Sequence, residues 1–182
     1  MRWLLGVLLV ALAGCSAGKD AVASGSDFVF VSPNGQTDIF YTDRKSIPDL
    51  SGENLLEPGK TLKLSDFPGP VVLNIWGSWC GPCRVEAGEL QKVHEAGNTV
   101  IGIDVRDFQR SAPQDFVRGR NLTYPSIYDP PARTLLSLRG YPRATVPSTI
   151  VLDRQHRVAA IYLRDLLATD LLPLLERLSA ET

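Results

Sequence analysis

Two kinds of apolar pattern alternate along this chain. Short apolar runs rich in β-branched residues are typical of buried strands, whereas apolar positions spaced by three and four residues are typical of a helix. Strands are predicted at 71–76, 99–104, 148–153 and 157–162. Helices are predicted at 83–93, 111–120 and 168–178, with a weaker one at 130–140. Elements in this order predict an α/β sandwich in which helices flank a central mixed sheet.

Turn and capping residues set the expected ends of these elements. Gly97 ends the first helix, and Ser111 is expected to cap the start of the second. Thr169 is expected to cap the last helix, with Pro173 still inside its first turn, where proline is tolerated. The stretch at 52–70 is rich in glycine, proline and polar residues and is predicted to be loop.

The part of the chain before residue 46 is predicted to lie outside the main domain. Phe28–Val31 and Ile39–Tyr41 are apolar segments around Asn34-Gly35, a dipeptide that favours tight turns, so an N-terminal β-hairpin is expected. Small and polar residues precede it and are typical of a flexible tether. The predicted organisation is a signal peptide at 1–14, a tether at 15–27, a hairpin extension at 28–45 and the main domain at 46–182.

The N-terminus has the features of an export signal. Arg2 is followed by an apolar run, 3–13, that is shorter than the ~20 residues needed to span a bilayer. The segment Leu12–Cys15 resembles the bacterial lipobox, which implies that Cys15 receives a diacylglyceryl group and becomes the mature N-terminus. The alternative is a simple secretory signal with an incidental cysteine. With the lipid, the protein would be extracytoplasmic and anchored to the outer face of the cell membrane.

Charge adds little to this picture. The net charge is −1 and the arginines and lysines are scattered, so the sequence offers no electrostatic footprint for nucleic acid. The chain has three cysteines, an odd number for an exported protein. If Cys15 is acylated, one pair remains, Cys80 and Cys83, in a compartment where disulfides form.

The Cys-x-x-Cys pair has three possible uses: metal binding, a structural disulfide or disulfide exchange. Pro82 lies where a helix begins, and backbone N–H groups at a helix start stabilise a thiolate. A thiol in this position can have its pKa lowered from ~8.5 to roughly 3.5–7.5. Cys80 would then attack a partner disulfide, and Cys83 would resolve the mixed disulfide.

The other two uses are disfavoured by ligand count and loop length. A structural zinc site needs four ligands, and the two histidines, His94 and His156, are poorly placed to supply them. So short a disulfide loop yields little entropic stabilisation. No metal and no cofactor is therefore expected beyond the redox-active pair itself.

The stretches "WGSWCGPCRVE" and "ATVPSTIVLD" together resemble the thioredoxin superfamily, and within it the TlpA/ResA-like extracytoplasmic thiol-disulfide oxidoreductases. The match covers roughly 46–178. It implies a thioredoxin-like sandwich. The flanking "VSPNGQTDIFY" and the lipobox are most similar to actinobacterial ResA-like lipoproteins associated with cytochrome c maturation.

The resemblance assigns roles to particular residues. Cys80 and Cys83 match the catalytic pair, and Pro147 matches the proline that is cis in this fold. Such a cis bond would leave the backbone of Val146 free to pair with an extended substrate. The residues expected to contact substrate are Trp79, Gly81, Pro82 and Val146.

Glu86 is the remaining predicted catalytic residue. Thioredoxin carries a buried Asp on the strand before its Cys pair, and Asn74 stands there instead, as in many branch members. Glu86 matches the acidic residue that those members carry after the second Cys, and it shares the helical stripe of Cys83 and Leu90. A buried carboxylate has a raised pKa and can carry a proton near neutrality. The alternative is a surface Glu favoured by the helix N-terminus.

These features predict an enzyme that reduces protein disulfides outside the cytoplasm. The resemblance implies the Cys pair of apocytochrome c as substrate and a CcdA-type membrane protein as electron donor. The alternative is an oxidase that forms disulfides in exported proteins. A Sco-like copper chaperone is less favoured, because the spacing of the two Cys is one residue too short for it. A non-catalytic scaffold is less favoured, because both Cys and the Val-Pro are intact.

Overall fold

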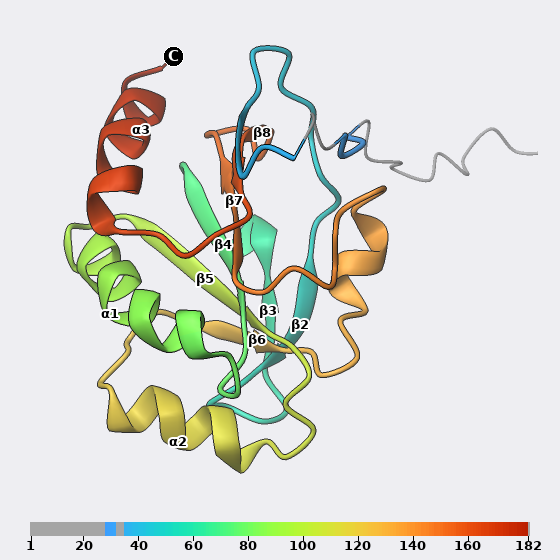
Figure 1. Ribbon diagram of the computed structural model, residues 1–182, viewed down its shortest axis with the longest axis vertical. Helices are drawn as coiled ribbons and strands as arrows, with labels where there is room; N and C mark the ends of the chain where they lie inside the picture. The colour runs from blue at the N-terminus through green and yellow to red at the C-terminus, as the bar shows by residue number, and fades with distance from the viewer. Residues whose placement is uncertain (1–27, 32–34, 182) are drawn as a thin grey trace, which may run out of the picture.

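The computed structural model describes residues 28–31 and 35–181 (Figure 1). The predicted signal peptide, the tether and Cys15 lie outside the described residues, as does Asn34. Within the described part of the chain, eight strands form one mixed sheet in the order β1-β8-β7-β4-β5-β6-β2-β3. The strands are β1 (Asp38–Phe40), β2 (Ser51–Asn54), β3 (Thr61–Lys63), β4 (Val71–Trp76), β5 (Thr99–Asp104), β6 (Ser126–Tyr128), β7 (Ser148–Leu152) and β8 (Val158–Tyr162).

Parallel pairing is confined to the part of the sheet that carries the site. Strand β4 pairs in parallel with β5, and β5 pairs in parallel with β6. The neighbours β4 and β7, and β7 and β8, are antiparallel. Every residue of β4 is buried, because the strand lies in the middle of the sheet with both faces covered. The strands predicted from apolar runs are confirmed within one residue at their ends.

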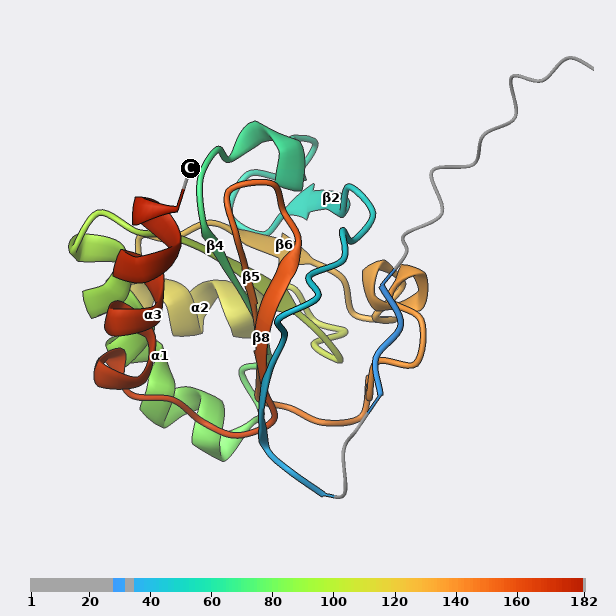
Figure 2. The same ribbon diagram turned by 90° about the horizontal axis from the view of Figure 1, so that it is seen from above.

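The helices lie on one face of the sheet. They are α1 (Gly81–Glu95), α2 (Ser111–Gly119) and α3 (Ala168–Ala180). Figure 2 shows the three helices together on one side, with the N-terminal segment and a 3₁₀ turn at Thr134–Ser137 on the other. Each face has its own apolar cluster, so β4 sends Leu73 and Ile75 to one cluster and Val72 and Trp76 to the other. The predicted α/β architecture is confirmed, but helices do not flank both faces.

The N-terminal hairpin prediction is wrong for the described residues. Strand β1 pairs with β8, and Val29 forms a bridge with Arg139 instead of with β1. Side chains of the two segments are in contact, since the ring centroids of Phe28 and Tyr41 are 5.5 Å apart. Phe28 and Ile39 are buried in the cluster on the helix-free face. Packing on the sheet thus buries apolar side chains of both segments.

Three local expectations are also corrected. The segment predicted as a weaker helix at 130–140 forms only the 3₁₀ turn at Thr134–Ser137, and the loop expected at 52–70 contains part of β2 and all of β3. Ser111 is the first residue of α2 and not its cap, which is Arg110. Local sequence did not reveal these bounds because each depends on packing against the sheet.

The last helix begins at the predicted residue, Ala168, but its expected cap is corrected. Leu167 is the N-cap of α3, so Thr169 lies inside the helix. The Asp170 carboxylate accepts the Leu167 N–H at 2.9 Å, which satisfies a free donor at the helix start. Pro173 therefore lies within the helix, beyond its first turn. None of the described helices is both long and apolar enough to cross a membrane.

Candidate active site

The loop that joins β4 to α1 is fixed by groups that follow β5. The Asp107 carboxylate accepts the Ser78 N–H at 2.6 Å and the Ser78 hydroxyl at 2.7 Å. The Trp79 indole N–H donates to the Val105 carbonyl oxygen at 3.0 Å. Gly77 permits this close approach, since a Cβ there would lie 2.9 Å from that same carbonyl oxygen. The backbone leading to the Cys pair is thus held on both sides of Ser78.

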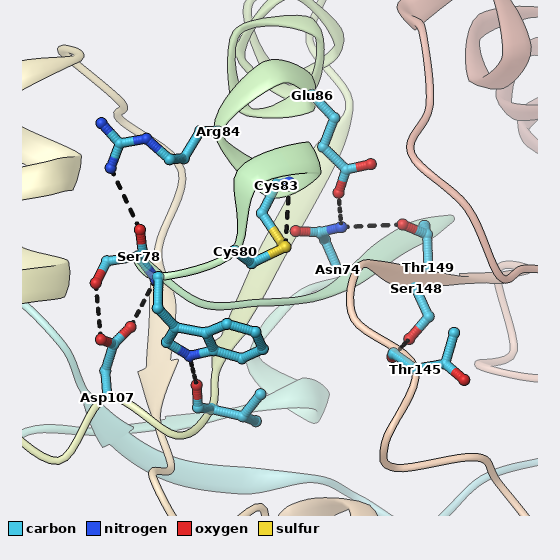
Figure 3. The surroundings of a disulfide bond; sticks show 12 residues. Asn74, Ser78, Cys80, Cys83, Arg84, Glu86, Asp107, Thr145, Ser148 and Thr149 are labelled. Atoms are coloured by element: carbon cyan, nitrogen blue, oxygen red, sulfur yellow. Dashed lines mark hydrogen bonds between the residues drawn. A yellow bond between two sulfur atoms is a disulfide. The ribbon is translucent and has the colours of Figure 1, made fainter.

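Cys80 and Cys83 form a disulfide at the N-terminus of α1 (Figure 3). Their Cα atoms are 5.3 Å apart. Cys80 is the N-cap of the helix, and its Sγ accepts the Cys83 N–H at 3.2 Å. In the reduced protein the same N–H and the helix dipole would stabilise a Cys80 thiolate. The predicted helix start and the pairing of these two cysteines are confirmed.

Both cysteines are buried, at 3% and 2% exposure. Burial therefore does not distinguish the attacking from the resolving residue, whereas the cap position does. The surroundings of the pair are open: Gly81 and Pro82, the first residues of α1, are exposed, and Trp79 is 48% exposed. These are three of the residues expected to contact substrate.

The Val146–Pro147 bond is cis, as the resemblance implied. Figure 3 places Thr145 and Ser148, which flank this bond, on the side of the disulfide away from Ser78. Val146 packs against the apolar cluster that contains both cysteines. In the part of the chain that the structure describes, its backbone groups take no hydrogen bond, so they remain available to an extended chain.

Glu86 is buried beneath the disulfide, and the surface alternative is wrong. The side chain is 1% exposed, and its carboxylate accepts the Asn74 side-chain N–H at 2.5 Å and the Leu166 backbone N–H at 2.9 Å. Asn74 also donates to the Thr149 hydroxyl at 3.0 Å. Figure 3 shows the Asn74 amide lying between the sulfur atoms and Glu86. Glu86 and the Asn74 amide thus form one buried polar group, on the side of the disulfide away from Arg84 and Ser78 (Figure 3).

Burial raises the pKa of Glu86 to about 7, although the two hydrogen bonds that it accepts favour the charged form. Near neutral pH the side chain is thus present both as acid and as carboxylate. The structure thus places a titratable carboxyl group, Glu86, three residues after Cys83 on the same helix.

Comparison with known proteins fits this geometry. A model of the AhpC/TSA family matches residues 44–161. The chain belongs to the AhpC/TSA family. A thiol:disulfide interchange protein DsbE of Vibrio cholerae is 32% identical over 143 residues, covering 75% of this chain and 76% of that protein. A thiol-disulfide oxidoreductase ResA of Bacillus subtilis is 24% identical over 153 residues, covering 80% and 70%.

A solved structure extends the likeness to the whole fold. A secreted thiol-disulfide isomerase from Corynebacterium glutamicum matches with a TM-score of 0.84 at 47% identity, covering 86% of this chain and 100% of that chain. The predicted thioredoxin-like fold and the resemblance to TlpA/ResA-like proteins are confirmed. This AhpC/TSA-family protein is a thiol-disulfide oxidoreductase with Cys80 and Cys83 at disulfide distance.

Sequence reasoning missed two acidic residues near the site. Asp107, which holds Ser78, lies outside any periodic pattern. Asp104 ends β5, opposite Trp76 of β4, and is completely buried, with no donor to either carboxylate oxygen. Burial raises the pKa of Asp104 to about 9; a side-chain hydrogen bond with Asp107, which favours the protonated form, and the charges of Asp107 and Asp129 add to the effect. An Asp closing an otherwise apolar strand was the only signal in the sequence.

The histidines take no part in a metal site within the described ranges. No three His, Cys, Asp or Glu side chains are grouped there so as to hold a metal ion. His94 Nδ1 lies 3.2 Å from the Asn98 carbonyl oxygen, and His156 Nε2 lies 3.0 Å from that of Phe67. One ring nitrogen of each histidine thus lies against a backbone carbonyl oxygen.

Replacing Glu86 by Gln should change how stability depends on pH. The unfolded chain has the ordinary Glu value of 4.5, and the folded protein has a pKa of about 7. The folded state therefore loses stability as pH rises between these values, by up to about 3 kcal/mol. Gln does not titrate, so the free energy of unfolding of E86Q should gain on the wild type by about that amount from pH 4 to pH 8. Urea unfolding across this range measures it.

The test is the change of the stability difference with pH and not its absolute size. Gln places an N–H₂ group against one of the two donors, Asn74 or Leu166, at every pH, which adds a constant cost. Glu95→Gln, at the exposed end of the same helix, is the matched control and should leave the pH profile unchanged. Parallel profiles for E86Q and the wild type would contradict the raised pKa.

Replacing Asp104 by Asn should stabilise the folded protein at neutral pH. The pKa of Asp104 rises from 3.8 in the unfolded chain to about 9 in the folded protein, so folding at pH 7 requires proton uptake. This costs up to about 4 kcal/mol at pH 7 and nothing near pH 4. The stability gain of D104N over the wild type should therefore grow with pH between 4 and 8, as measured by urea unfolding. A change at the exposed Asp115 to Asn controls for the chemistry; a gain independent of pH would overturn the interpretation.

Proposed function

We propose that this protein reduces disulfides of exported proteins outside the cytoplasm, with the Cys pair of apocytochrome c as its substrate. The observation that carries the proposal is the Cys80–Cys83 disulfide at the start of α1, in the apolar cluster against which Val146 packs with its backbone groups free. Such a site can bind an extended polypeptide so that one sulfur of the polypeptide's disulfide lies next to Cys80 Sγ. The relatives named DsbE and ResA support this class of reaction.

Electrons and protons balance in two exchange steps. The Cys80 thiolate attacks one sulfur of the substrate disulfide, forming a Cys80–substrate bond and releasing the other substrate sulfur as a thiolate. Cys83 then loses its proton and attacks Cys80 Sγ, which closes the Cys80–Cys83 disulfide and releases the second substrate thiolate. Two electrons pass to the substrate, whose thiolates take up two protons. A CcdA-type membrane protein would return the protein to the dithiol by the reverse exchange.

Glu86 supplies the proton acceptor that the second step requires. Its pKa of about 7 lets it take the Cys83 proton at neutral pH and return it later. Its carboxylate is held in place by the Asn74 side-chain N–H and the Leu166 backbone N–H. Glu86 is accordingly a positioning and proton-holding residue in this scheme.

The redox potential of the purified domain tests the direction of electron flow. Gly81-Pro82 is the dipeptide of thioredoxin, whose potential is roughly −270 mV, whereas DsbA stands at roughly −120 mV. We expect a value near the thioredoxin end, because a reductase must give up electrons to substrate disulfides. Equilibration with glutathione or dithiothreitol buffers, followed by thiol alkylation and mass spectrometry, measures it. A value near that of DsbA would favour the disulfide-forming alternative.

A trapping experiment in the same preparation identifies the substrate. Cys83→Ala leaves the mixed disulfide on Cys80 without a resolving thiol, so captured proteins remain linked. Apocytochrome c should be among them, and the Cys80→Ala, Cys83→Ala double variant should capture none. Capture of exported proteins other than cytochromes would keep the exchange chemistry and replace the substrate.

The proposed site of action requires a membrane anchor at Cys15. The lipobox-like Leu12–Cys15 segment supports it. The full chain expressed in a lipoprotein-processing bacterium should fractionate with membranes, and Cys15→Ser should release it from them. Mass spectrometry of the N-terminal peptide should find the diacylglyceryl group on Cys15. Identical fractionation of both forms, with an unmodified Cys15, would leave a plain secretory signal in its place.

A further inference from the structure

A groove lies beside the redox pair, between the start of α1 and the length of α2. Its open volume is about 690 Å³, and its lining includes Ser78, Arg84, Asp115, Phe116 and Arg120. Neither the exchange chemistry nor the Glu86 arrangement uses these side chains apart from Ser78. The groove is distinct from the Val146 side of the disulfide, where the substrate backbone is expected.

The floor of the groove is an aromatic ring that carries two guanidinium groups. Phe116 is 8% exposed and packs against Trp76 of β4, with ring centroids 5.3 Å apart. The guanidinium carbons of Arg84 and Arg120 lie 5.3 Å and 4.9 Å from the Phe116 centroid. Stacking on a buried ring orders both side chains in advance.

These two arginines lack an anionic partner in the part of the chain that the structure describes. The Arg84 guanidinium donates to the Ser78 carbonyl oxygen at 3.3 Å, and the Arg120 guanidinium lies over the Phe116 ring. By contrast, Arg164 is paired with two carboxylates. Asp115, the acidic residue of the groove, instead lies 3.9 Å from Arg118. Two like charges on one ring are thus left uncompensated, and an anion between them would relieve their repulsion.

The groove is close to the attacking cysteine. Ser78 precedes Cys80 by two residues, and the Arg84 backbone N–H donates to the Cys80 carbonyl oxygen at 3.2 Å. Figure 3 shows Arg84 leaving α1 on the Ser78 side, away from Glu86, Thr145 and Ser148. A chain that pairs with Val146 and crosses Cys80 would continue toward this groove. What it presents there is a side chain a few residues from its own cysteine.

We propose that this groove binds the carboxylate of an Asp or Glu side chain in the substrate polypeptide, close in sequence to the cysteine that Cys80 attacks. The inference rests on the proposed exchange with a polypeptide disulfide. Guanidinium groups match a carboxylate in geometry and can hold it through paired hydrogen bonds. The two arginines would thereby select among disulfide substrates and speed the encounter with acidic ones.

Paired peptides test the proposal. Oxidised peptides with one Cys-x-x-Cys disulfide are made in two series, with Glu or with Gln moved along the positions on both sides of the cysteines. The reduced protein should react roughly threefold to tenfold faster with the best Glu peptide than with its Gln twin at low salt. Rapid alkylation and mass spectrometry give the rates, and the preference should shrink in high salt.

Variants assign the preference to the groove. Arg84→Gln with Arg120→Gln should bring the Glu-to-Gln rate ratio close to one. The matched control, Arg139→Gln with Arg154→Gln, removes the same charge far from the groove and should keep the wild-type ratio. A ratio cancels any change in Cys80 reactivity caused by losing Arg84. The single variant Arg120→Glu, at an exposed position, should reverse the preference toward a Lys peptide.

The outcomes separate this inference from the function it rests on. If the wild type reacts with neither peptide of a pair, the proposed exchange fails and the groove inference falls with it. If both peptides react at equal rates at every Glu position, exchange stands and the groove inference is overturned. A preference that persists in both the double variant and Arg120→Glu would also overturn it, since the carboxylate would then be recognised elsewhere.

Discussion

The hydrogen bond from the Cys83 N–H to Cys80 Sγ ties the chemistry of this protein to its fold. It exists because α1 begins at the residue after Cys80, directly beyond the end of the fully buried strand β4. Central burial of β4 fixes where the helix starts, and the helix start fixes which sulfur receives backbone donors. Asp107 completes the constraint by holding Ser78, so the loop cannot drift away from the helix. The reactivity of Cys80 thus depends on contacts that involve no sulfur.

The polar side chains under this helix are retained at a cost in stability. Glu86 and Asp104 both lie on the helix-covered face, where apolar residues would pack without proton uptake. Glu86 differs from Asp104 in having partners, since Asn74 and Leu166 donate to its carboxylate. Those bonds keep the pKa of Glu86 near neutrality, at about 7, whereas Asp104, which has no donor to its carboxylate, has a pKa of about 9. Only the former exchanges its proton in the range where thiols react.

The sequence predicted the elements whose structure follows from the spacing of apolar residues within the element. The four strands, the helix after Cys80 and the inward stripe that buries Glu86 follow from apolar periodicity. The cis bond before Pro147 came from family resemblance alone, because a proline codes for either isomer. The hairpin prediction was wrong because each segment packs on the sheet instead of pairing with the other. The sequence of the two segments does not show that the sheet offers them this surface. Asp107 was missed because its role depends on which loops meet at the end of β4.

The disulfide divides the site into two sides with different tasks. On the inner side, Asn74 and Glu86 are buried, and of the two Glu86 is the group that can take up or release a proton. On the outer side, Arg84 and Arg120 are exposed and lie over the ring of Phe116. The same helix supplies Arg84 and Glu86, two residues apart, and so turns one toward each side. In the proposed scheme, recognition and proton transfer would lie on different faces of one helix, so substrate charge could vary without disturbing the buried acid.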